Sequence, residues 1–245
     1  MRIWHWIVLA GTLVLSACGA LGQGAEVSGW PSVDLGATEV VEYKSTPERP
    51  LHLHVFQQDS STPAGAVLFF HGGGYSSTRV PQFEHQARAL AEVGITGIIV
   101  EYRVTAEGTS VDDAIADGVD AASYVRDNAA DLGIDPELVA LAGSSAGGNL
   151  AVRAQEVDRS GAALVLFNPA VDASHASALQ DQAAIVFHSR QDTIISFGSA
   201  SGFCDAVENC TIDAFDEGDH GFFNNEPALT ETTTSMIEFL TSRGW

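Results

Sequence analysis

Short apolar runs recur along the chain from about residue 38 and are separated by more polar segments. Several runs are continuous and rich in Val, Ile, Leu and Phe, as expected for strands that are buried on both faces of a sheet. The runs that fit this description are 51–56, 66–70, 95–100, 138–143, 162–167, 183–188 and 211–215. The pattern predicts a sheet of mostly parallel strands.

Segments with helical periodicity lie between many of these runs. Apolar residues recur three or four positions apart in 81–93 and 111–128, and a last helix is expected at 229–242. The chain has 245 residues, which is enough for one sizeable domain. The order of elements predicts an α/β fold, with a mostly parallel, twisted sheet covered by helices on both faces and no second domain.

Two local features refine the expected path of the chain. No helical segment separates the runs at 51–56 and 66–70, so these strands are expected to pair as a hairpin or to lie at an edge. Asp135 and Pro136 are expected to end a loop before the strand at 138–143, because such pairs favour turns.

The first residues do not fit this pattern. Residues 1–17 hold one Arg, an apolar run and then small residues, which is typical of a signal peptide. The ending LSAC resembles a bacterial lipobox, which implies cleavage before Cys18 and lipidation of Cys18; a short uncleaved membrane anchor is the alternative. Residues 18–37 are Gly-rich and are predicted to form a flexible tether, and 38–245 the folded domain.

Export would bring the chain into an oxidising compartment. A disulfide between Cys204 and Cys210 is then expected, and two free buried thiols are the alternative. A lipid on Cys18 would anchor the domain to the cell envelope, and Gly19 after this cysteine favours the outer membrane or the periplasmic face. The chain carries 11 basic and 32 acidic residues, a net charge of −21, which argues against nucleic-acid and polyanionic partners.

The segment GSSAGGN, from Gly143 to Asn149, places a tight turn between a predicted strand and an Ala-rich helix. Ser145 has glycine two positions before it and two positions after it, whereas Ser144 has alanines there. A nucleophile elbow needs small residues at these two positions, because its turn is sharp. The spacing therefore selects Ser145 as the candidate nucleophile.

A second glycine cluster, HGGGY at 71–75, follows another predicted strand. Glycines leave backbone N–H groups free to stabilise an oxyanion, and Gly73, Gly74 and Ala146 are the candidate donors. A phosphate-binding loop is the alternative, although no Lys follows the glycines. His71 is expected to shape this loop rather than to act as a base.

An acid and a base are expected after the nucleophile, in that order. Asp192 and His220 each follow the end of a predicted strand, at the edge where open α/β sheets bind ligands. Asp192 would orient the His220 imidazole, and His220 would accept the Ser145 proton. Asp172, which also follows a strand, is the second candidate for the acid.

Residues 66 to about 225 resemble the α/β-hydrolase superfamily, and within it the esterase and lipase branch related to hormone-sensitive lipase. The motifs HGGGY, EYR at 101–103, the segment 128–151 and DHGF at 219–222 carry the resemblance. It implies an ester hydrolase without a cofactor, with Ser145, Asp192 and His220 as the triad.

The chain departs from this branch at two points. Ser144 stands where its members usually carry an acidic residue, and only 47 positions separate Ser145 from Asp192, which leaves little or no room for a cap domain. The resemblance therefore extends toward small esterases that act on short acyl groups or carbohydrate-linked esters. An amide hydrolase, peptidase-like or formamidase-like, and a non-catalytic envelope binding protein are the alternatives.

The remaining candidate residues have more ordinary interpretations. Tyr75 and Phe222, together with Phe223, either line a substrate pocket or belong to the core. His52 and His54 share one face of a strand, and a solvent-facing pair is favoured over a metal site because no third ligand is nearby. No partners are predicted for His85 and His175, and no metal is expected.

Overall fold

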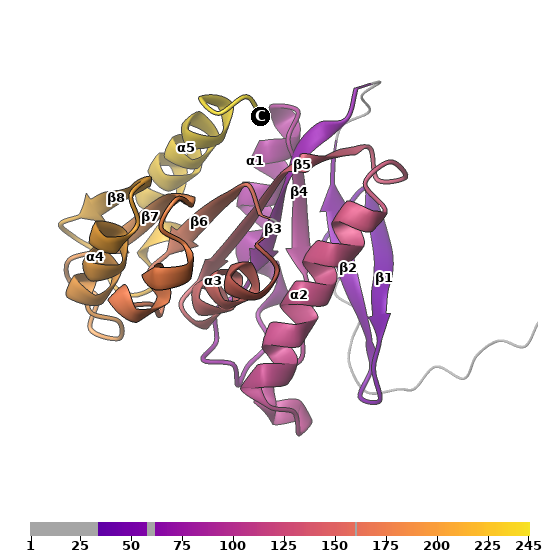
Figure 1. Ribbon diagram of the computed structural model, residues 1–245, viewed down its shortest axis with the longest axis horizontal. Coiled ribbons are helices and arrows are strands. Elements are labelled where there is room, and N and C mark those ends of the chain that lie inside the picture. The colour runs from indigo at the N-terminus through magenta and orange to yellow at the C-terminus, as the bar shows by residue number, and fades with distance from the viewer. Residues whose placement is uncertain (1–33, 58–61, 160) are drawn as a thin grey trace, which may run out of the picture. The chain divides into compact units, whose positions relative to one another are not determined.

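The computed structural model describes residues 34–57, 62–159 and 161–245. The predicted signal peptide at 1–17, Cys18 and most of the tether lie outside these ranges. Strands in the described residues form one sheet in the order β1-β2-β4-β3-β5-β6-β7-β8 (Figure 1). Their bounds are β1 Glu39–Ser45, β2 Pro50–Phe56, β3 Ala64–Phe70, β4 Thr96–Val100, β5 Ile134–Ser144, β6 Ala163–Phe167, β7 Ala183–Ser189 and β8 Cys210–Phe215.

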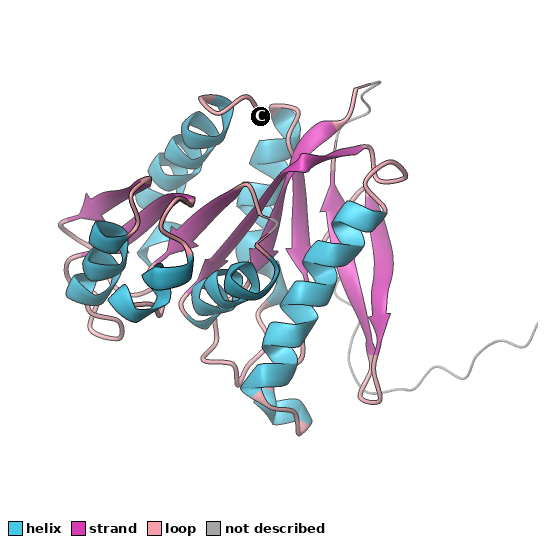
Figure 2. Cartoon of the chain, in the orientation of Figure 1, coloured by secondary structure: helices cyan, strands magenta, loops and turns pink. Residues whose placement is uncertain are grey.

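Helices cover both faces of this sheet (Figure 2). The α-helices are α1 Glu84–Glu92, α2 Val111–Asp127, α3 Ala146–Asp158, α4 Phe197–Ala206 and α5 Ala228–Thr241, and the 3-10 helices are η1 Val80–Phe83, η2 Thr105–Glu107, η3 Ala173–Ala178 and η4 Phe222–Asn224. One apolar cluster joins α2, α3 and α4 to the sheet, and a second joins α1 and α5 to its other face. The predicted α/β architecture is confirmed.

The sheet is antiparallel at one end and parallel elsewhere. β2 pairs antiparallel with both β1 and β4, whereas every pairing from β4 through β3 to β8 is parallel. The expected hairpin of the strands at 51–56 and 66–70 is therefore wrong, because β4 lies between β2 and β3. The partner of β2 in a hairpin is β1, whose apolar residues are interspersed with exposed polar ones.

Three other features of the fold differ from the predictions. Asp135 and Pro136 lie inside β5, where the pairing register with β3 shifts between Ala64 and Ala66 and so tolerates a proline. Helix α4 was not predicted, because its sequence FGSASGFCDA is rich in small residues. Leu35 is buried in the core, so the packed domain begins before the predicted boundary at residue 38.

A charged cluster holds β1 against α2. Asp117 on α2 is fully buried and accepts hydrogen bonds from Lys44 Nζ at 2.6 Å and from Arg103 Nε and Nη2 at 2.9 and 2.8 Å. Lys44 also pairs with Asp120, whose side chain is 52% exposed. The cluster joins the edge strand, the segment after β4 and α2 by means of one buried carboxylate.

Two further observations concern the cysteine pair and membrane-spanning helices. The sulfurs of Cys204 on α4 and Cys210 on β8 lie 2.06 Å apart, at the distance of the expected disulfide. Within the described part of the chain, no helix combines the length and the apolar character that crossing a membrane requires.

Candidate active site

Ser145 lies at the turn between β5 and α3, with φ +51° and ψ −120°. Left-handed backbone is unusual for a residue with a side chain and is typical of functional turns. The flanking glycines are required by close contacts: a Cβ at Gly147 would lie 2.1 Å from the Phe70 carbonyl oxygen, and one at Gly143 would lie 2.3 Å from that of Gly147. The elbow therefore has a steric basis in the packing of β3 against this turn.

The segment after β6 holds the backbone of Ser145. Its N–H donates to the carbonyl oxygens of Phe167 and Asn168, at 3.1 and 3.2 Å, and its own carbonyl oxygen accepts from Ala170 N–H at 3.0 Å. Both peptide groups of Ser145 are thus paired outside the elbow, and its side chain is half-buried at the first turn of α3.

Asp192 and His220 form a hydrogen-bonded pair. His220 Nδ1 donates to Asp192 Oδ2 at 2.7 Å, and the side chains are 26% and 0% exposed respectively. Asp192 Oδ1 also accepts from the N–H groups of Ile194 and Ile195, at 2.8 and 3.0 Å. Burial alone would raise the pKa of Asp192, but the hydrogen bonds from His220 and these two amides outweigh burial and lower it.

Ser145 and His220 follow β5 and β8 at the carboxyl edge of the sheet. No hydrogen bond between their side chains is present among the described residues. Such contacts are often long without substrate and shorten when it binds. Between these two strand ends lie β6 and β7, and Asn168 after β6 donates through Nδ2 to the His220 carbonyl oxygen at 2.7 Å.

The HGGGY loop has a left-handed backbone at three successive residues, Gly73, Gly74 and Tyr75, with φ of +134°, +61° and +58°. Among the described residues, nothing accepts a hydrogen bond from the N–H groups of Gly73, Gly74 or Ala146. These donors are therefore available to a bound oxygen atom, whereas Gly72 N–H is already paired with Gln82 Oε1 at 2.7 Å.

Gln82 joins this loop to the elbow, and the sequence did not predict that role. The same Oε1 atom that accepts from Gly72 N–H also accepts from Ser144 Oγ at 2.9 Å. A Cβ at Gly72 would lie 2.9 Å from Ser144 Oγ, which shows how closely the two segments approach. Ser144, directly before the nucleophile, is thus joined to the segment at Gly72 through one Gln82 oxygen.

Comparison with known proteins adds an independent observation. Residues 67–222 match the family model described as alpha/beta hydrolase fold, which is more than half of the chain. The chain belongs to the α/β-hydrolase family. Carboxylesterase NlhH of Mycobacterium tuberculosis is 43% identical over 95 residues, which cover 36% of this chain and 28% of that protein. The arylesterase of Saccharolobus solfataricus is 32% identical over 121 residues, or 49% of this chain and 39% of that protein.

The matched segments thus cover well under half of these curated relatives. A solved structure is similar over a greater length. The esterase Est2 of Thermogutta terrifontis has a TM-score of 0.80 and 25% identity, with coverage of 86% of this chain and 94% of that one. The same esterase with propionate bound gives a TM-score of 0.80 at 26% identity.

In this α/β hydrolase, the second candidate acid lies apart from His220. Asp172 is 60% exposed and accepts from His175 Nδ1 at 3.3 Å. His175 Nε2 accepts from Asn149 Nδ2 at 3.2 Å, and Asn149 Oδ1 accepts from the Tyr75 hydroxyl at 2.8 Å. His175 therefore has the partners that were not predicted, and Asp192 rather than Asp172 contacts His220.

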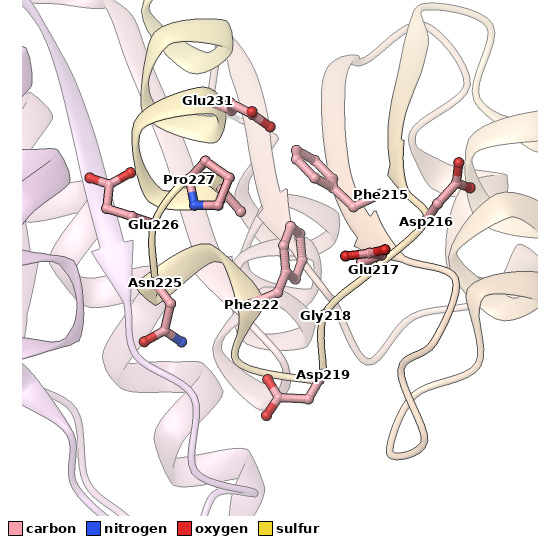
Figure 3. Close-up of a pocket in the computed structure, with 11 residues that line it drawn as sticks. Phe215, Asp216, Glu217, Gly218, Asp219, Phe222, Asn225, Glu226, Pro227 and Glu231 are labelled. Atoms are coloured by element: carbon pink, nitrogen blue, oxygen red, sulfur yellow. The ribbon is translucent and has the colours of Figure 1, made fainter.

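Phe222 and Phe223 are both buried in the second apolar cluster, and Phe222 also lines a pocket. Phe223 stacks on Phe83 with ring centroids 5.7 Å apart and belongs to the core. Phe222 packs on Phe215 at 4.7 Å and lines a pocket of about 490 Å³, which Figure 3 shows with several acidic side chains around it. Ser145, Asp192 and His220 do not line this pocket, so a role of Phe222 in binding substrate stays a prediction, as it does for Tyr75.

His71 has a structural role beside the glycines of the HGGGY loop. His71 is buried, its ring stacks on Tyr102 at 4.3 Å, and its Nδ1 donates to the Gly72 carbonyl oxygen at 2.7 Å. Burial lowers the pKa of His71 to about 4, so the ring is neutral near pH 7.

The prediction of a solvent-facing pair is wrong for His54, whereas the His52 side chain is 31% exposed. His54 is 2% exposed and its Nε2 donates to Glu101 Oε1 at 3.0 Å, while His52 Nδ1 lies 3.4 Å from Glu101 Oε2. His54 lies directly opposite Ile99 of β4 in the sheet, and Ile99 belongs to the apolar cluster that includes α1, so this face of the sheet is covered at His54. Within the described residues, no group of three or more His, Cys, Asp or Glu side chains could hold a metal ion.

Proposed function

We propose that this chain is a serine carboxylesterase in which Ser145 is the nucleophile, His220 the general base and Asp192 the residue that orients it. The observation that carries the proposal is the 2.7 Å hydrogen bond between His220 Nδ1 and Asp192 Oδ2 at the sheet edge that also holds the strained elbow of Ser145. The carboxylesterase and arylesterase relatives support the same reaction class.

In the proposed mechanism, Ser145 Oγ attacks the ester carbonyl carbon while its proton passes to His220 Nε2. The N–H groups of Gly73, Gly74 and Ala146 donate to the developing oxyanion. The tetrahedral intermediate expels the alcohol, which takes the proton from His220. Water then attacks the acyl-enzyme and gives a proton to His220. The second tetrahedral intermediate breaks its bond to Ser145 Oγ, which takes that proton back from His220 as the carboxylic acid leaves.

The proposed substrates carry short acyl groups. No cap domain stands between β6 and α4 in this fold, where η3 and β7 occupy the chain. Structures of the Thermogutta terrifontis esterase with propionate and with butyrate are similar to this chain, which supports acyl groups of this size. A long acyl chain would need walls that the stretch between β6 and α4 does not add to the site.

Turnover of p-nitrophenyl acetate by the wild type and by Ser145→Ala tests the proposal. The wild type should hydrolyse the ester and Ser145→Ala should lose at least about a thousandfold in kcat, since the nucleophile is gone. Ser144→Ala is the matched control and should keep most of the activity. Unchanged turnover in Ser145→Ala would overturn the assignment, and faster cleavage of the matching anilide than of the ester would favour an amide hydrolase.

We also propose that the chain is exported and anchored to the cell envelope through a lipid on Cys18. The LSAC sequence supports this, although these residues lie outside the described ranges. The intact mass of the membrane-extracted protein tests the proposal: it should show loss of residues 1–17 and added acyl chains, and Cys18→Ser should move the protein to the soluble fraction. Membrane partition that Cys18→Ser leaves unchanged would contradict it.

A further inference from the structure

Asn168 is a fully buried polar residue that immediately follows β6, between the strands that carry the candidate catalytic side chains. We propose that Asn168 is a positioning residue that fixes Ser145, the His220 loop and the turn bearing Asp192 relative to one another. This inference rests on the proposed function, because it assigns Asn168 a role in the geometry of the same site.

The first contact is to the nucleophile. The Asn168 carbonyl oxygen accepts from Ser145 N–H at 3.2 Å, and two residues later Ala170 N–H donates to the Ser145 carbonyl oxygen at 3.0 Å. Pro169, between them, packs on α3, where a Cβ at Gly148 would lie 2.8 Å from the Pro169 Cβ. The position of the Ser145 backbone therefore depends on the conformation of the chain at Asn168.

The second contact is to the base. Asn168 Nδ2 donates to the His220 carbonyl oxygen at 2.7 Å. His220 lies in the loop that follows β8, and its side chain is partly exposed. The buried amide of Asn168 thus restrains the peptide group of His220 directly through this hydrogen bond.

The third contact is to the acid-bearing turn. Asn168 Oδ1 accepts from Ser189 N–H at 3.1 Å, at the end of β7. Ser189 in turn accepts from Gln191 N–H on its Oγ at 3.1 Å and from Asp192 N–H on its carbonyl oxygen at 3.3 Å. Ser189 Oγ also donates to the Gly218 carbonyl oxygen, two residues before His220.

These contacts need an amide in a left-handed backbone. Asn168 has φ +40°, a conformation that asparagine tolerates better than most residues with a side chain. One side-chain atom must donate to His220 and the other must accept from Ser189, which an amide does and a carboxylate does not. The backbone N–H of Asn168 continues the pairing with β7 by donating to Phe187 O at 2.8 Å.

Kinetics of Asn168→Asp and Asn168→Ala test the inference, measured below the unfolding temperature of each variant. Both should lower kcat by about 10- to 100-fold with KM changed by less than about threefold, because misplaced groups slow the chemistry more than the binding. Asn168→Asp should also move the acidic limb of the kcat/KM profile to higher pH, because a carboxylate near His220 favours the protonated imidazole.

Gln155→Ala is the matched control. Gln155 is also a buried amide, with its Nε2 donating to Gly161 O at 3.0 Å and its Oε1 accepting from Gly161 N–H at 2.8 Å, at the opposite end of α3 from Ser145. It should lose stability while its kcat and pH profile stay those of the wild type.

Folded Asn168 variants with wild-type kcat and pH profile would overturn the inference, and so would a Gln155→Ala variant that loses kcat equally. If Asn168→Ala does not fold, the isosteric Asn168→Asp variant decides. Ser145→Ala, assayed in parallel, separates the two proposals. If it stays active, the proposed function fails; if it is inactive while the Asn168 variants stay fully active, only this inference fails.

Discussion

Gln82 Oε1 accepts two hydrogen bonds, one from Gly72 N–H beside the oxyanion loop and one from Ser144 Oγ beside the nucleophile. Loss of the Ser144 hydroxyl leaves the Gly72 contact in place, whereas loss of the Gln82 side chain leaves the Gly72 N–H without its acceptor. A buried N–H group without an acceptor lowers the stability of the fold. The loop is therefore expected to shift until the Gly72 N–H finds another acceptor.

We therefore expect Gln82→Ala to lower kcat for a short-chain ester by about tenfold or more, and Ser144→Ala by less than about threefold. Steady-state kinetics of both variants and of the double variant measure the difference. The effect of the double variant should equal that of Gln82→Ala alone, because both bonds share one acceptor. A larger loss in Ser144→Ala than in Gln82→Ala would contradict this account.

The burial of His71, beside the oxyanion loop, makes the free energy of unfolding depend on pH. The unfolded chain takes up a proton on His71 near its ordinary pKa of 6.5, but the folded chain does so only near pH 4. Between these values the unfolded state holds more protons, so the free energy of unfolding falls as pH decreases, by about 3 kcal/mol from this residue.

Urea unfolding of the wild type and of His71→Asn at several pH values between about 7 and about 4 measures this contribution. The wild type should lose more stability across the window than the variant does. Parallel pH dependences of the two proteins would show that His71 is protonated in the fold, contrary to its burial.

At the scale of elements, the buried carboxylate of Asp117 joins β1 and the segment after β4 to α2. Its removal leaves Arg103 with no buried partner, so Asp117→Ala should lower the free energy of unfolding by about 3 to 5 kcal/mol. Asp120→Ala removes an exposed partner of the same Lys44 and should cost at most about 1 kcal/mol. Chemical denaturation measures both, and equal losses would contradict a buried role for Asp117.

The elements that the sequence predicted well are those with continuous apolar runs. All seven predicted strands are present; β3, β4, β6 and β7 are apolar because both of their faces are buried, whereas the edge strand β8 is only partly buried. The edge strand β1 and the helix α4 were missed, since β1 exposes one side to solvent and six of the ten residues of α4 are Gly, Ser or Ala. The pairing of β2 with β1 and β4 depends on contacts between distant segments, which periodicity does not contain.

The candidate site likewise contains residues that the sequence predicted and residues that it did not. Glycine spacing marked Ser145 and the HGGG loop because the close approach of backbones leaves a visible pattern in the sequence. Asn168 and Gln82 left no such pattern, because a single polar residue after a strand or in a 3-10 helix has many ordinary explanations. Their roles depend on which segments the fold brings to each amide.

The whole molecule carries a net charge of −21, with 32 acidic and 11 basic residues. Repulsion among these carboxylates opposes the compact state, and salt screens it over distances beyond about 10 Å at 0.1 M. The melting temperature should therefore rise when NaCl is increased from about 0.02 M to about 0.5 M. Thermal unfolding followed by circular dichroism measures it, and a fall with salt would show that attractive pairs dominate.

The central claim is that Ser145 is an activated nucleophile, and the most direct measurement is the site of covalent modification by a fluorophosphonate probe. The account predicts that a single label forms on the wild type, that peptide mass spectrometry places it on Ser145, and that Ser145→Ala takes up none. A folded wild type that takes up no label, or a label found on Ser144 instead, would contradict it.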